Sequence, residues 1–81
     1  MLMNPQHPRW DEFVERLEGP EGCNFRESDD GRTIWTCKGG RDKSFAMAIL
    51  ETMEGVDVSA SLAWFERYGG YCDCEILFNC T

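Results

Sequence analysis

Hydrophobic residues recur three or four positions apart in three segments of the chain. This spacing lines one face of an α-helix. The first helix is expected to open near Pro8, where a proline removes no helical hydrogen bond, and to end at Gly19-Pro20. Two more are expected within residues 42–55 and 57–69, each with an aspartate to cap its start and a glycine at its end. The short link between them predicts an antiparallel helical hairpin.

A β-hairpin is predicted between the first two helices, over residues 23–37. A three-residue loop at 29–31 would end in a glycine, the residue that the left-handed position of this turn favours. It pairs Phe25 with Trp35 and the two terminal cysteines of the segment with each other. A two-residue Asp-Gly turn is the alternative, but it sets Phe25 opposite Thr36 and divides the apolar residues between two faces. We therefore favour the three-residue loop.

The last segment, residues 71–78, alternates in a way that predicts a third strand. Its buried face is expected to carry Cys72, Cys74, Ile76 and Phe78. The predicted element order is α-β-β-α-α-β, an α+β fold with a three-stranded antiparallel sheet and helices packed on one face. Residues 1–81 are expected to form a single domain, with residues 1–7 as a loose tail.

In this topology four cysteines converge at one end of the sheet: Cys23, Cys37, Cys72 and Cys74. Four thiolates can hold a structural zinc ion, which would stabilise a domain this small. The spacing differs from common zinc knuckles, because a single residue separates the last two cysteines. Small buried thiols are the preferred interpretation, with zinc the alternative and redox chemistry the third. We therefore expect no required cofactor. The fifth cysteine, Cys80, is expected at a frayed end.

The chain is acidic, with a net charge of −7 from 15 acidic and eight basic side chains. The negative electrostatic potential of such a chain disfavours binding to nucleic acid and to anionic membranes. No apolar run approaches the roughly 18 residues needed to cross a bilayer. The start lacks a basic segment followed by an apolar one, so we expect no signal peptide and a cytoplasmic location, where disulfides are disfavoured.

The outer face of the predicted sheet mixes apolar and charged side chains: Tyr71, Asp73, Glu75, Leu77, Ile34 and Arg26. Such a face can dock a partner protein or a second copy of the chain. Two carboxylates on one strand could also bind a cation, but no third ligand or partner base accompanies them. The loop at residues 37–44 lacks the glycine that a phosphate-binding loop requires before its lysine.

Residues 69–79 have the sequence Gly-Gly-Tyr-Cys-Asp-Cys-Glu-Ile-Leu-Phe-Asn. This segment resembles a group of small bacterial proteins, classed only as a domain of unknown function, that end in a Cys-Asp-Cys-Glu strand. The likeness extends to residues 61–65 and, more loosely, to Cys37. The resemblance singles out the four residues of the motif, Cys72 to Glu75, and implies no activity.

Together these features predict a non-enzymatic protein-binding or regulatory module, which a structural zinc could stabilise. The alternative is a thiol- or metal-dependent activity centred on Cys72-Asp73-Cys74-Glu75.

Overall fold

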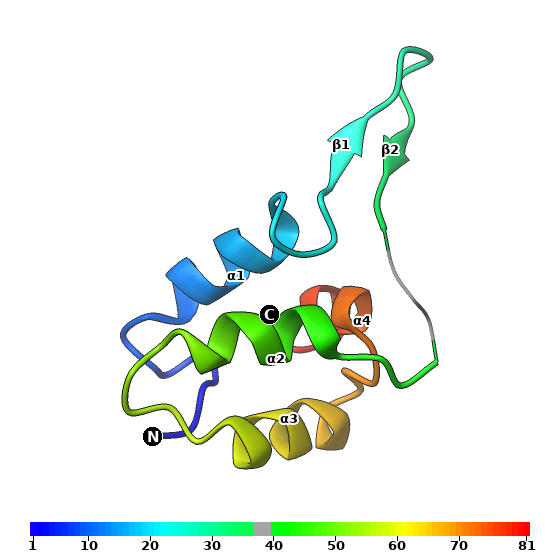
Figure 1. Cartoon of the computed structure of the whole chain (residues 1–81). Coiled ribbons are helices and arrows are strands. Elements are labelled where there is room, and N and C mark those ends of the chain that lie inside the picture. The colour runs from blue at the N-terminus through cyan, green and yellow to red at the C-terminus, as the bar shows by residue number, and fades with distance from the viewer. Residues whose placement is uncertain (37–39) are drawn as a thin grey trace.

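The structure, a computed structural model, describes residues 1–36 and 40–81. In these residues four helices form a body from which a two-stranded hairpin projects (Figure 1). The elements in chain order are α1 (Trp10–Glu18), β1 (Arg26–Glu27), β2 (Thr33–Ile34), α2 (Ser44–Glu51), α3 (Val58–Arg67) and α4 (Asp73–Asn79). The fold is therefore α+β, as predicted.

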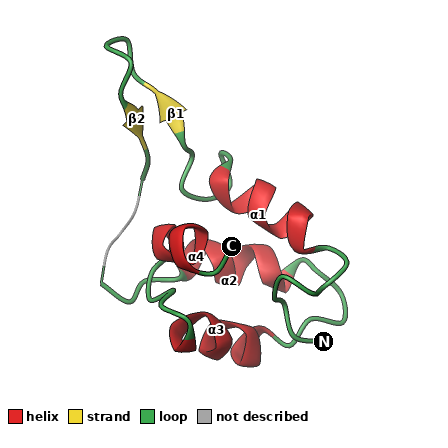
Figure 2. Cartoon of the chain, turned by 180° about the vertical axis from the view of Figure 1, so that it is seen from behind, coloured by secondary structure: helices red, strands yellow, loops and turns green. Residues whose placement is uncertain are grey.

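Helix α2 lies at the centre of the body and packs against each of the other three helices (Figure 2). Its Ile49 and Leu50 are buried against the apolar faces of α1 and α3. In the same core, Phe13 of α1 and Phe65 of α3 stack with ring centroids 5.5 Å apart. The three amphipathic segments of the sequence thus form the helices predicted for them.

The ends of the helices follow the local signals in the sequence. The Asp57 carboxylate accepts the backbone N–H of Ala60 at 3.0 Å and so caps α3. Gly69, with a φ of 93°, lies two residues beyond the last residue of α3. A glycine adopts this left-handed conformation without the steric cost of a Cβ atom, which explains why α3 stops there. Helix α2 instead ends at Glu51, before the expected Gly55, whose φ of 78° serves the link to α3.

The hairpin has the predicted register. Arg26 pairs with Ile34, and the Ser28 N–H donates to the Arg32 carbonyl at 2.7 Å across a loop of three residues. Gly31 has a φ of 83°, as the three-residue loop requires. The same register brings the rings of Phe25 and Trp35 together, stacked at 5.3 Å. The alternative two-residue turn is therefore wrong.

The predicted third strand is wrong, because α4 takes its place. Among the described residues the hairpin forms the only sheet, with two strands. Residues Asp73, Ile76 and Cys80 are buried, and Leu77 packs partly against the core. Their spacing of three and four residues is helical, not alternating. This stripe is not evident in the sequence because its first member, Asp73, is a charged residue.

The N-terminal residues are not the loose tail that the sequence suggested. Met3 is fully buried, and its N–H donates to the Ser61 hydroxyl at 2.9 Å. The Asp57 N–H donates to the Met1 carbonyl at 2.8 Å, and the Met1 amino group bonds to the Gly55 carbonyl. The segment therefore fixes the link between α2 and α3.

Candidate functional site

The Cys-Asp-Cys-Glu motif forms the start of α4, and Asp73 fixes its position. Asp73 is fully buried. One carboxylate oxygen accepts the Ala46 N–H at 2.8 Å, and the other accepts the Phe45 N–H at 3.2 Å. Both donors belong to the first turn of α2, whose N–H groups have no partner within the helix. Asp73 therefore caps α2 from α4, next to the Asp42 carboxylate, which accepts the Ser44 N–H at 2.9 Å.

The two cysteines that flank Asp73 bring their sulfur atoms together. The Sγ atoms of Cys72 and Cys74 are 3.3 Å apart. Cys72 is buried, at 3% exposure, whereas Cys74 is half-buried. The Cys72 thiol also donates to the Glu75 carboxylate, with 3.4 Å between Sγ and Oε1. Cys72, Cys74 and Glu75 thus form one small cluster at the start of α4.

The other two predicted zinc ligands belong to the hairpin. Cys23 is fully buried, and its carbonyl accepts the Thr36 N–H at 2.7 Å, which continues the hairpin pairing toward the body. Cys37 lies outside the described residues. Within the described part of the chain, no group of three or more histidine, cysteine, aspartate or glutamate side chains is arranged to hold a metal ion.

Cys80 differs from the motif cysteines. It was expected at a frayed end, but it is 6% exposed and belongs to the hydrophobic core. Its thiol donates to the Phe65 carbonyl, with 3.6 Å between the atoms. Burial raises the pKa of the Cys80 thiol, since a thiolate would lose its hydration there. Cys80 is therefore an inert part of the core.

A partly buried ion pair supports the segment that enters α4. Lys43, with its side chain 10% exposed, places its Nζ 2.5 Å from the Glu66 carboxylate at the end of α3. The same ammonium group is 3.4 Å from the Tyr71 carbonyl. The hydrogen bond from Lys43 lowers the pKa of Glu66. This pair joins α2, α3 and the chain immediately before Cys72.

The structure divides the six predicted interaction residues. Asp73 is buried, and Leu77 packs against the core, so neither forms part of an outer sheet face. Tyr71 is 39% exposed, with the Arg41 guanidinium 4.9 Å from its ring centroid. Arg26 and Ile34 are exposed on the hairpin, and Glu75 is half-buried beside the thiols. Of the remaining four residues, Arg26 and Ile34 pair on the hairpin, whereas Tyr71 lies before α4 and Glu75 lies within it.

Three aromatic side chains form a surface cluster, of which the sequence predicted only the pairing of Phe25 with Trp35. Phe78 of α4 contacts both hairpin rings edge-on, at 5.8 Å from Phe25 and 5.7 Å from Trp35. Trp35 is 43% exposed and Phe78 is 55% exposed. The alternation had predicted the Phe78 side chain inside the fold. We call Phe25, Trp35 and Phe78 the aromatic cluster.

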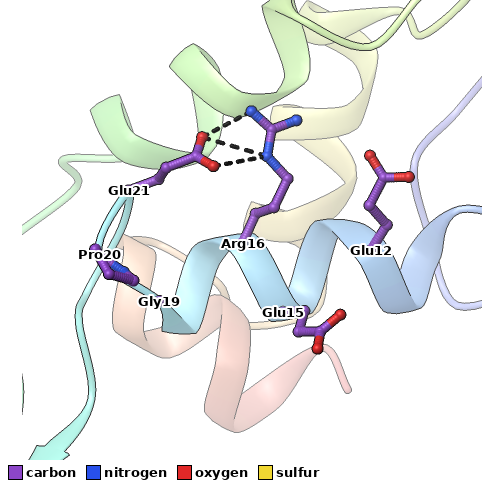
Figure 3. Close-up of a pocket in the computed structure, with 6 residues that line it drawn as sticks. All are labelled: Glu12, Glu15, Arg16, Gly19, Pro20 and Glu21. Carbon is purple, nitrogen blue, oxygen red and sulfur yellow. Dashed lines mark hydrogen bonds and ion pairs between the residues drawn. The ribbon is translucent and has the colours of Figure 1, made fainter.

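A hollow of about 240 Å³ lies on α1 and the turn after it, but the one cation that lines it, Arg16, is already paired. Figure 3 shows Glu21 facing Arg16, whose guanidinium it binds with a shortest contact of 2.7 Å. Arg16 also donates to the Thr52 hydroxyl at 2.8 Å. The arginine therefore links α1 to the end of α2, and the hollow offers no assembled chemistry.

A family model described as "Protein of unknown function (DUF2695)" matches residues 33–79, more than half of the chain. The chain belongs to this family. The DUF2695 match starts on β2 and ends with α4, so it contains Cys37 and the complete motif at residues 72–75 but not Cys23. No curated protein and no solved structure matches the chain.

The family match agrees with the resemblance to a domain of unknown function seen in the sequence. It assigns no activity to the chain. In the described part of the chain, every helix is too short or too polar to span a bilayer.

Proposed function

We propose that this DUF2695 protein is a non-enzymatic module that binds another protein through the aromatic cluster. The observation that carries the proposal is the exposure of Trp35 and Phe78, at 43% and 55%, although both rings pack on neighbours. A hollow of about 260 Å³ lies beside Trp35, lined also by Thr33 and Ile34. Tryptophan and other aromatic side chains are enriched among the residues that dominate binding energy at interfaces.

Packing within the aromatic cluster favours binding, because rings that are already held lose little conformational entropy on contact. Phe25 stacks on Trp35, and Phe78 holds both from α4. The cluster therefore presents a rigid apolar surface made by two elements that are distant in sequence.

The charge of the chain indicates the kind of partner. With a net charge of −7, two copies repel each other at long range, whereas a basic protein is attracted. We therefore propose a partner that places an apolar side chain on the aromatic cluster and surrounds it with lysine or arginine. Salt should weaken the association by slowing the encounter.

The test compares capture by the wild-type chain with capture by two variants, Trp35→Ala and Phe78→Ala. A protein identified by mass spectrometry should be retained by the wild type and lost, by at least about tenfold in affinity, with either variant. Met47→Ala and Tyr68→Ala serve as controls, because these side chains are also exposed, at 41% and 53%, but lie on other surfaces. Equal loss with the control variants would contradict the proposal.

Light scattering decides between a foreign partner and a second copy of the chain. A monomer at micromolar concentration agrees with the proposed basic partner. A dimer that Phe78→Ala dissociates would place a second copy on the aromatic cluster instead. Circular dichroism of each variant establishes that the fold is retained.

Zinc stabilisation, predicted from four cysteines, is a separate proposal for the same fold. It is supported by the contact between Cys72 and Cys74, not by the aromatic cluster.

A further inference from the structure

The distance between the two motif sulfurs is close to that of a metal chelate. Two thiolates at about 2.3 Å from a tetrahedral zinc ion lie about 3.8 Å apart. The Sγ atoms of Cys72 and Cys74 are 3.3 Å apart, so they would have to separate by only about 0.5 Å. A disulfide bond of about 2.05 Å would require them to approach by about 1.2 Å. The observed spacing therefore favours a shared ion over a disulfide.

The backbone between the two thiols is fixed independently of any ligand. Asp73 is held by hydrogen bonds from Phe45 and Ala46, and its own N–H donates to the Asp42 carbonyl at 3.2 Å. The two cysteines are thus anchored on both sides of a buried residue. A chelate that is already arranged in this way loses little entropy when it binds an ion.

The surroundings of Cys72 differ from those of a thiol that only fills space. Cys80 packs within the main hydrophobic cluster of the core, whereas Cys72 is buried outside that cluster. Cys72 faces a second sulfur and the Glu75 carboxylate. These are groups that can bind a cation or take up a proton.

We propose that Cys72 and Cys74 together chelate one thiophilic divalent cation, with zinc as the expected ion. Binding forms two sulfur–zinc bonds and breaks two S–H bonds. The Glu75 carboxylate, 3.4 Å from the Cys72 sulfur, can accept the Cys72 proton and pass it to solvent, and the half-buried Cys74 releases its proton to solvent. The pair supplies two of the four ligands of tetrahedral zinc.

The first experiment measures metal in the full chain purified without chelator. Elemental mass spectrometry should find about one zinc per chain. Cys72→Ser and Cys74→Ser should each lower the affinity for zinc by at least about a hundredfold in competition with a chromophoric chelator. Cys80→Ala is the matched control, since it removes a thiol from the core and should leave zinc affinity unchanged.

If both serine variants fail to fold, cobalt substitution of the wild-type chain provides the second measurement. Cobalt bound by thiolates gives intense charge-transfer absorption in the near ultraviolet, so its presence supports the chelate. Weak absorption from cobalt bound only by oxygen and nitrogen would overturn it.

Three further results would overturn the proposal. The first is less than one zinc per chain, at a level that Cys72→Ser does not change. The second is a disulfide, detected as a loss of two hydrogens in mass from a chain that binds no metal. The third is zinc that is lost only when Cys80 is replaced by alanine. The chelate is independent of the aromatic cluster. A wild-type chain that binds zinc but captures no partner refutes the binding proposal alone, whereas a wild-type chain that captures its partner but binds no zinc refutes the chelate alone.

Discussion

The carboxylate of Asp73 accepts the backbone N–H of Ala46 at 2.8 Å, so a residue of α4 caps a helix that begins 29 positions earlier in the chain. This contact explains why an aspartate stands between the two motif cysteines. It satisfies N–H groups that α2 cannot satisfy itself, and it places the thiols at the same time. Asp73 thus has a structural role in the Cys-Asp-Cys-Glu motif that it would lack on the outer face of the predicted strand.

Replacing Asp73 with alanine should destabilise the fold by about 2–4 kcal/mol, because two N–H groups of α2 lose a buried acceptor. Urea unfolding followed by circular dichroism measures this change. Asp42→Ala is the matched comparison: it removes the bond from the Ser44 N–H to a half-buried carboxylate and should cost about 1 kcal/mol. An equal or smaller effect at Asp73 would show that its carboxylate does not cap α2.

Gly70→Ala should destabilise the fold by about 1–3 kcal/mol through overpacking. A Cβ atom there would lie 2.9 Å from both the Cys80 sulfur and Ile76 Cγ1, and 3.1 Å from the Phe65 carbonyl. Cys80→Ala removes one of these contacts, so the double variant should lose less stability than the sum of the single variants. Strict additivity of the unfolding free energies would contradict the predicted contact.

The Lys43–Glu66 pair should make stability depend on pH in the acidic range. The pKa of Glu66 is lower in the folded chain than in the unfolded one, so the pair stabilises the fold above the ordinary glutamate value of about 4.3. This contribution disappears as the pH falls through the lowered pKa. Chemical unfolding at pH 7 and pH 3 should therefore show a larger advantage of wild type over Glu66→Gln at pH 7. A constant difference would rule out the titration of this pair.

Alkylation should distinguish the cysteines of α4 and its end in the metal-free, reduced chain. Cys74 is half-buried, whereas Cys80 is 6% exposed and burial raises its pKa. Because the thiolate is the reactive form, iodoacetamide should modify Cys80 more slowly, by on the order of tenfold or more. Peptide mass spectrometry over time gives the two rates, which should converge in denaturant. Faster native labelling of Cys80 would contradict its place in the core.

Local patterns in the sequence determined the first three helices and the hairpin. In α1 and α3 the apolar residues are spaced so that only a helix brings Phe13 and Phe65 to one core. Gly31 and Gly69 occupy backbone conformations that other residues adopt at a cost, so their positions mark a turn and a helix end directly. These signals act over a few residues, and no distant contact overrides them.

Only the tertiary structure decided the last element and the site on it. Over residues 71–78 the apolar residues alternate, and the helical stripe appears only once Asp73 is counted as an inward-facing residue. Its charge can be buried because α2 offers two N–H groups at that place, and this pairing is invisible in the local sequence. The same long-range contact determines how Cys72 and Cys74 meet and exposes Phe78 beside the hairpin.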